Sequence, residues 1–172
     1  MNIPVMPEIP ARMKKFPLWK NRFPIFYTVM TMEDGTPNFR VVSRKRQVEA
    51  SEKNLCHLCG ERLEGVVYFI GSKEDLAEHY SGDGPMHLDC AEYAAKACPW
   101  LSNPDGVLRG VNYTSNKVYT ELIKEIKGQP RPAEMGIVGS RRYVADLRSQ
   151  YPIFIFGDVV YEDWNIIPTR KE

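Results

Sequence analysis

The stretch Cys56-His57-Leu58-Cys59-Gly60 and its downstream counterpart His87-Leu88-Asp89-Cys90 decide how this chain folds. Each stretch offers two metal donors separated by two residues, a spacing that lets a tight turn or one helical turn present both donors to one centre. Together they supply three thiolates and one imidazole, the ligand set of a closed structural zinc site. We therefore predict one bound Zn²⁺, held by what we call the Cys3His group: Cys56, Cys59, His87 and Cys90.

A redox-active dithiol is the alternative interpretation of the first cysteine pair. A thioredoxin-type pair lies at a helix start inside a βαβ unit, whereas here Gly60 and an apolar β-forming segment follow the pair. Since protein ligands would fill all four positions around the zinc, we expect a structural rather than a catalytic metal. Cys98, next to Pro99, is expected to be a small buried hydrophobic residue, and His57 is expected on the surface.

Composition indicates an ordinary globular protein, with 43% hydrophobic and 26% charged residues in 172. The first residues contain prolines where a signal peptide needs an apolar stretch, and no run approaches the length of a membrane span. We therefore expect a cytoplasmic protein. Four cysteines in such a chain favour metal binding over disulfides.

The net charge of +1 conceals an uneven distribution. Residues 1–55 carry 10 Lys and Arg against 5 Asp and Glu, whereas residues 56–110 carry 4 against 9. The basic segment either neutralises the acidic segment beside it or meets an acidic partner such as nucleic acid. Solvated helix and strand faces are the simpler explanation for the candidate contact residues, which are Arg44, Lys45, Arg46, Arg141 and Arg142.

The domain organisation follows from the prolines and from the donor pairs. Four prolines in residues 1–22 predict an extended arm that lies over the core. We expect residues 23–172 to form a single α+β domain, with the zinc centre at 55–101. A knuckle, a β-rich segment and a helix from His87 that donates two ligands from its first turn have the layout of a treble clef.

Secondary structure flanks this centre on both sides. Strands at 23–32 and 38–42 around Asp34-Gly35 predict an N-terminal hairpin. The interval between the two donor pairs has room for another hairpin and a short helix. On the C-terminal side we expect a helix and strands, at 117–127, 136–144, 153–156 and 159–164, with a turn at Gly157-Asp158 before the last strand.

The chain also resembles a group of uncharacterised bacteriophage and prophage proteins. The resemblance spans most of the sequence and is most specific in the block from His87 to Leu101. It rests on Gly35-Thr36-Pro37-Asn38-Phe39-Arg40, Cys56-x2-Cys59-Gly60, Gly84-Pro85-Met86-His87-x2-Cys90-Ala91-x-Tyr93-Ala94, Cys98-Pro99-Trp100-Leu101 and Phe156-Gly157-Asp158. The resemblance implies a phage-type zinc-binding protein with a treble-clef-like core, acting in the bacterial cytoplasm. It implies no activity.

Three function classes remain. A nuclease of the His-Asn-His type needs a histidine base and further metal ligands, but with His87 on zinc and His57 in the knuckle only His79 is left of three histidines. We therefore expect no enzyme, and a degenerate nuclease is least favoured. A nucleic-acid-binding module would use the basic N-terminal region and its aromatic residues. A zinc-stabilised module that binds a host or phage protein is the function that we favour.

Overall fold

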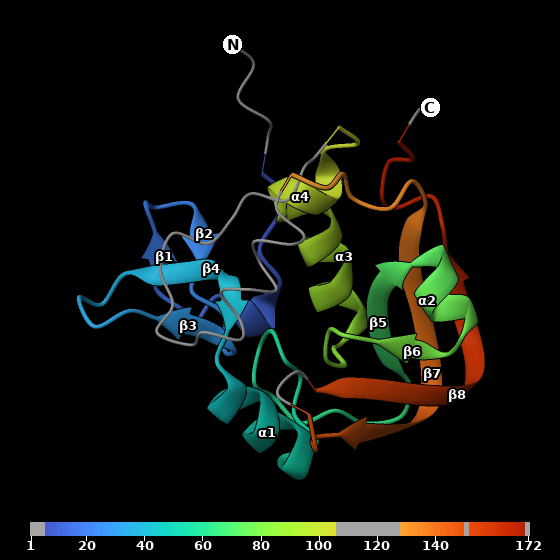
Figure 1. Cartoon of the computed structure of the whole chain (residues 1–172). Helices are drawn as coiled ribbons and strands as arrows, with labels where there is room; N and C mark the ends of the chain where they lie inside the picture. Colours follow the sequence, from blue (N-terminus) through green and yellow to red (C-terminus); the bar gives the residue numbers. More distant parts are fainter. Residues whose placement is uncertain (1–5, 106–127, 150–151, 171–172) are drawn as a thin grey trace.

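The computed structural model describes residues 6–105, 128–149 and 152–170, and its fold is mixed α+β, as predicted (Figure 1). The helices are the 3-10 turn η1 (Ala11–Met13), α1 (Arg44–Lys53), α2 (Lys73–Ala77), α3 (Leu88–Ala97) and α4 (Pro99–Ser102). The strands are β1 (Leu18–Trp19), β2 (Phe23–Pro24), β3 (Val29–Thr31), β4 (Pro37–Val42), β5 (Val67–Ser72), β6 (Tyr80–Ser81), β7 (Met135–Asp146) and β8 (Ile153–Asp163).

A four-stranded antiparallel sheet with the order β5-β7-β8-β6 forms the C-terminal side of the molecule. The long hairpin of β7 and β8 lies in its middle, and the two strands from the interval between the donor pairs lie at its opposite edges (Figure 1). The expectation of a local hairpin in that interval is therefore wrong. Strand β5 pairs instead with β7, which comes much later in the chain, and its Phe69 stacks on Phe156 of β8 at 4.8 Å in the core.

One long strand, β8, replaces the two strands and the turn that Gly157-Asp158 predicts. The pairing register with β7 shifts between Gly139 and Ser140, so the ladder absorbs an extra residue as a β-bulge. Asp158 takes the positive φ of 55° in this region, a conformation that Asp tolerates better than most residues. The turn-like sequence thus marks a bulge inside a strand.

The predicted N-terminal hairpin is present as β3 and β4, but its first strand is shorter than expected. Phe23 pairs with Trp19 of β1 instead. The part of the arm that the structure describes is not extended throughout, since it contains the 3-10 turn η1. Met13 of η1 is only 1% exposed and belongs to the hydrophobic core, which fixes the arm beside the knuckle.

Helix α3 connects the sheet to the Cys3His group. Its buried face, which includes Cys90, Ala91 and Ala95, packs into the same core as β5. Strand β5 also forms a bridge with the residue before His87: Tyr68 and Met86 exchange two backbone hydrogen bonds of 2.9 Å each. The sheet therefore sets the position of His87. The helix predicted at 117–127 lies outside the described residues.

Candidate metal centre

The first donor pair lies on a tight knuckle turn. The backbone N–H of Cys56 donates to the Glu61 carbonyl, and that of Gly60 donates to the Cys56 carbonyl, both at 2.8 Å. Gly60 has φ +72°, and a Cβ there would lie 2.8 Å from the Tyr27 ring. Both observations explain why glycine follows Cys59, because other residues rarely adopt this φ and would collide with the ring.

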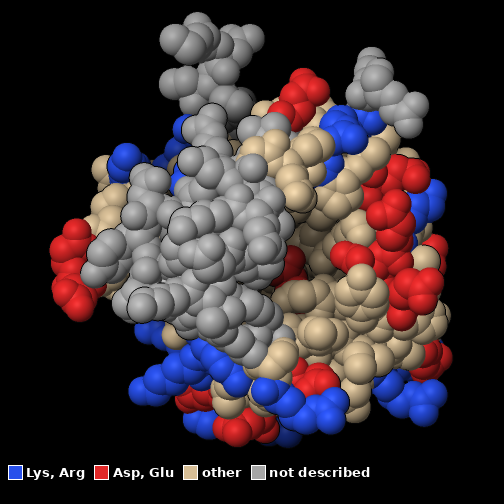
Figure 2. All heavy atoms as spheres, viewed as in Figure 1, with Lys and Arg blue, Asp and Glu red and all other residues tan. Residues whose placement is uncertain are grey.

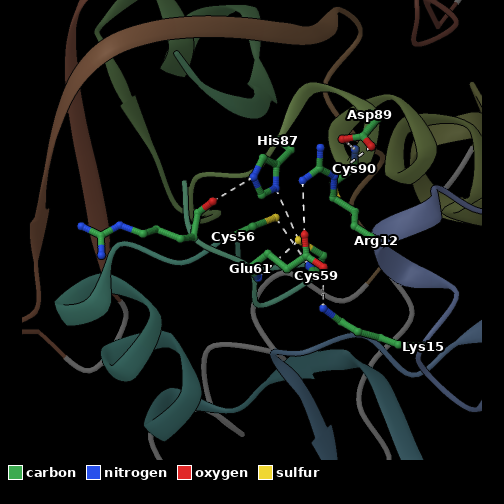
Figure 3. A network of polar contacts seen from close by, with 9 residues as sticks. Arg12, Lys15, Cys56, Cys59, Glu61, His87, Asp89 and Cys90 are labelled. Carbon is green, nitrogen blue, oxygen red and sulfur yellow. Dashed lines mark hydrogen bonds and ion pairs between the residues drawn. The ribbon is translucent and has the colours of Figure 1, made fainter. Parts of the chain in front are cut away.

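The second pair straddles the start of α3. His87 is the N-cap residue with extended backbone angles, and Cys90 follows within the first helical turn. The His87 side chain does not cap the helix. Its ring is turned toward the knuckle instead, where it meets the first pair (Figure 3).

The structure brings the whole Cys3His group together, close enough to bind a metal ion. The four ligand atoms all lie within 4.8 Å of one another, and the Cys59 Sγ lies 3.4 Å from the His87 Nδ1 (Figure 3). The three cysteines are at most 1% exposed. A core of three buried sulfurs and one ring nitrogen is chemically suited to zinc or another thiophilic ion.

Hydrogen bonds around the group orient its members for metal binding. The Nε2 of His87 lies 3.1 Å from the Arg62 carbonyl. Because a carbonyl only accepts, Nε2 must carry the proton, which leaves the Nδ1 lone pair directed at the sulfurs. Backbone N–H groups also point at sulfur, from Cys59 to the Cys56 Sγ at 3.5 Å and from Glu61 to the Cys59 Sγ at 3.4 Å. Such contacts stabilise thiolates.

Contacts among the buried thiols shift the pKa values of Cys56 and Cys90 in opposite directions. Burial raises the pKa of Cys56, but hydrogen bonds from the Cys59 and Cys90 thiols and from the backbone outweigh it and lower the pKa to about 3. The same thiol contacts raise the pKa of Cys90. These shifts favour a Cys56 thiolate beside a protonated Cys90 thiol, since a second thiolate would repel the first. A divalent cation would remove this repulsion, so the donor set fits a metal.

The N-terminal arm covers the rim of the group with ion pairs (Figure 3). Arg12 Nε lies 2.9 Å from Asp89 Oδ2, and its Nη1 lies 3.4 Å from Glu61 Oε2. Lys15 Nζ lies 2.9 Å from the other Glu61 oxygen. The hydrogen bond to Asp89 is the main cause of a raised Arg12 pKa. Part of the basic segment thus neutralises acidic residues beside the Cys3His group.

The expectation of a surface position for His57 is wrong. The side chain is 4% exposed, and its ring meets Phe154 edge-on at 5.2 Å. Burial lowers its pKa to about 4, so the ring is neutral at pH 7. The reason is that the β6–α3 loop closes over the ring, and the backbone N–H of His57 donates to the Pro85 carbonyl at 3.1 Å.

Cys98 lies apart from the four ligand atoms. It follows the last residue of α3 and is partly buried rather than fully so. Burial raises the pKa of its thiol. Both features agree with a packing role for this cysteine.

The basic candidate residues lie in two elements, Arg44, Lys45 and Arg46 in α1 and Arg141 and Arg142 in β7. Figure 2 shows Lys and Arg side chains gathered over α1, and Asp and Glu side chains over α2. Arg44 donates to the Leu147 carbonyl at 2.9 Å, which ties α1 to the end of β7. Arg46 donates to the Tyr27 carbonyl at 2.6 Å. The structure thereby joins these two to the fold, whereas Lys45 and Arg142 point into solvent.

Comparisons with protein-family models, curated proteins and solved structures give no match for this chain. Within the residues that the structure describes, no helix combines the length and apolar character needed to cross a membrane.

Proposed function

We propose that the Cys3His group binds one structural Zn²⁺ in a treble-clef-like centre, and that the chain is a non-enzymatic interaction module. The closed donor set carries this proposal. Three buried cysteines and the Nδ1 of His87 would fill a tetrahedral coordination sphere, and the other ring nitrogen of His87 is already bonded to Arg62. Such a centre has no position for a substrate or an activated water.

The knuckle and the first turn of α3 support the treble-clef-like description. They deliver the two donor pairs in the order and manner of that motif, from a tight turn with Gly60 and from a helix start. The strands between the pairs differ from a simple motif, because they join the β7–β8 hairpin. We infer a treble-clef-like centre built into a larger sheet.

The remaining histidines support binding rather than catalysis. His57 is buried against Phe154, and His79 stacks on Phe156 with ring centroids 5.6 Å apart. Within the described parts of the chain, no second cluster of three or more His, Cys, Asp or Glu is close enough to hold a metal. A His-Asn-His nuclease would need such a cluster.

The partner that we propose is a host or phage protein in the bacterial cytoplasm, in line with the phage resemblance. Nucleic acid is the second candidate. The basic surface over α1 favours it (Figure 2), as does the stacking of Arg22 and Arg46 on Phe23 and Tyr27 at 5.3 and 5.7 Å. Binding through this surface would weaken steeply with salt.

The first test is the metal content of purified protein and of a Cys56→Ser variant, by elemental analysis. We expect one zinc per chain in the wild type and loss of zinc, solubility and cooperative unfolding in the variant. The reason is that structural zinc contributes on the order of 10 kcal/mol to such centres. A soluble, zinc-free and equally stable Cys56→Ser protein would contradict the proposal.

Cys98→Ala is the matched control. This variant also removes a thiol, but one outside the Cys3His group. We expect it to keep one zinc and to lose about 1 kcal/mol of stability, since a small buried group is deleted. Loss of zinc from this variant would show that the ligand set is different.

A further inference from the structure

Strand β7 extends well beyond the strand that pairs with it on one side. The β5 partner ends at Val67, opposite Ser140, whereas β7 continues to Asp146 and pairs there only with β8. Among the described residues, no strand covers residues 141–146 on the β5 side. This half of β7 is therefore an open edge.

The register shows which backbone groups face the open edge. The N–H of Phe156 donates to the His79 carbonyl at 3.0 Å, so it points away from β7. In an antiparallel pair, the residue directly opposite then also points its N–H and C=O away from the partner strand. Tyr143 lies opposite Phe156, and Ala145 lies opposite Phe154. The N–H and C=O groups of Tyr143 and Ala145 consequently face outward, at the spacing that a further strand requires.

A groove of about 630 Å³ lies at this edge. Residues 141–144 of β7 line it on one side, together with residues 155–157 of β8. Asn54, Leu63, Gly65 and Val67 line it across from them. The Tyr143 hydroxyl donates to Asn54 Oδ1 at 2.8 Å, which holds the ring in place. The groove thus has both apolar and basic side chains in its lining, and the Tyr143 ring is held in place within it.

The charged residues of the groove indicate which kind of ligand it would bind. Its lining contains two arginines and no Asp or Glu. Arg141 reaches Asp158 only at 3.8 Å, and Arg142 is exposed and forms no ion pair with any residue that the structure describes. The guanidinium groups therefore favour an acidic ligand.

We propose that this edge binds an acidic, extended segment of a partner protein by strand addition. The proposal rests on the proposed interaction function and specifies its surface. The backbone of Tyr143 and Ala145 would supply the main-chain hydrogen bonds. Alternate side chains would fall on opposite faces, so acidic residues would lie beside Arg142 and apolar ones over Leu63. A nucleic acid would satisfy the arginines but not the strand-spaced N–H and C=O groups.

The test uses the full-length zinc-loaded protein and a fluorescein-labelled octapeptide in which glutamate and valine alternate. Fluorescence polarisation should show saturable binding, at least about tenfold tighter than that of the same peptide with lysine in place of glutamate. Amide exchange followed by NMR should slow at Tyr143 and Ala145, while Val144, which faces β8, stays unchanged. Unchanged exchange at Tyr143 and Ala145 would overturn strand addition.

Two matched charge reversals complete the test. Arg142→Glu should weaken peptide binding at least about tenfold, whereas Lys96→Glu, on an exposed position of α3 outside the groove, should change it less than about twofold. Equal effects of the two variants, or tighter binding of a single-stranded 20-mer DNA than of the peptide, would overturn the proposal. If the protein contains zinc but does not bind the peptide, only the proposed binding surface at β7 is refuted. If the protein folds without zinc, the proposed function is refuted.

Discussion

At the scale of single residues, the β6–α3 loop is adapted to the buried His57 ring. A Cβ built on Gly84 would lie 2.0 Å from His57 Nδ1, whereas one built on Gly82 would meet no atom within 4 Å. We predict that Gly84→Ala lowers the free energy of unfolding by about 1–3 kcal/mol, because the ring or the loop must move in a packed core. Thermal denaturation of the zinc-loaded wild type and variant measures this loss of stability.

Gly82→Ala is the control, since it makes the same substitution in the same loop without the collision. It should change stability by no more than about 0.5 kcal/mol. Equal melting temperatures for the two variants would mean that His57 is not packed as the structure shows.

His57 also shows how far the residues of the site could be predicted from sequence. The Cys3His group was predictable because its spacing is dictated by coordination geometry, and all four members meet. The burial of His57 depends on Phe154 and on the loop before α3, which are remote in sequence. No local pattern around a histidine between two ligands indicates such contacts.

At the scale of elements, the bulge in β8 is the feature that the sequence pattern misplaced. Asp158 has φ 55°, which costs a β-branched residue far more than it costs glycine. We predict that Asp158→Val destabilises the protein by about 1–3 kcal/mol, while Asp158→Gly is neutral or stabilises it by up to about 1 kcal/mol. Both variants lose the contact with Arg141, so their difference in chemical denaturation isolates the backbone. Equal stabilities would show that the bulge can straighten.

The elements themselves were predicted more successfully than their pairing. Helix α3 and strand β7 lie close to their expected positions, and α2 lies in the interval where a short helix is expected, because caps and apolar periodicity are local signals. The sheet order could not be predicted in this way. β5 and β6 pair with the distant β7 and β8, and these contacts depend on packing between residues that no spacing rule relates.

At the scale of the whole molecule, the opposite charges of the first two segments meet over the metal centre. Arg12 contacts Asp89, which is one residue before Cys90, and Glu61, which is two residues after Cys59. The arm therefore covers the rim of the Cys3His group at which Asp89 and Glu61 lie. We expect it to slow the departure of the metal, because it must detach before a chelator can approach the sulfurs.

We predict that purified Arg12→Gln protein still contains one zinc per chain. Its zinc should pass to a coloured chelator about three- to tenfold faster than that of the wild type, as expected when one or two partly exposed ion pairs are removed. Lys14→Gln is the control, because Lys14 pairs with the strongly exposed Glu8, at 3.4 Å, and with no other residue that the structure describes. The difference in the rate of zinc loss between the two variants should become smaller in 1 M salt, where ion pairs are screened. Equal rates for Arg12→Gln and Lys14→Gln at low salt would mean that the arm lies beside the centre without protecting it. If the difference in rate persists in high salt, the packing of Met13, and not charge, slows the loss of zinc.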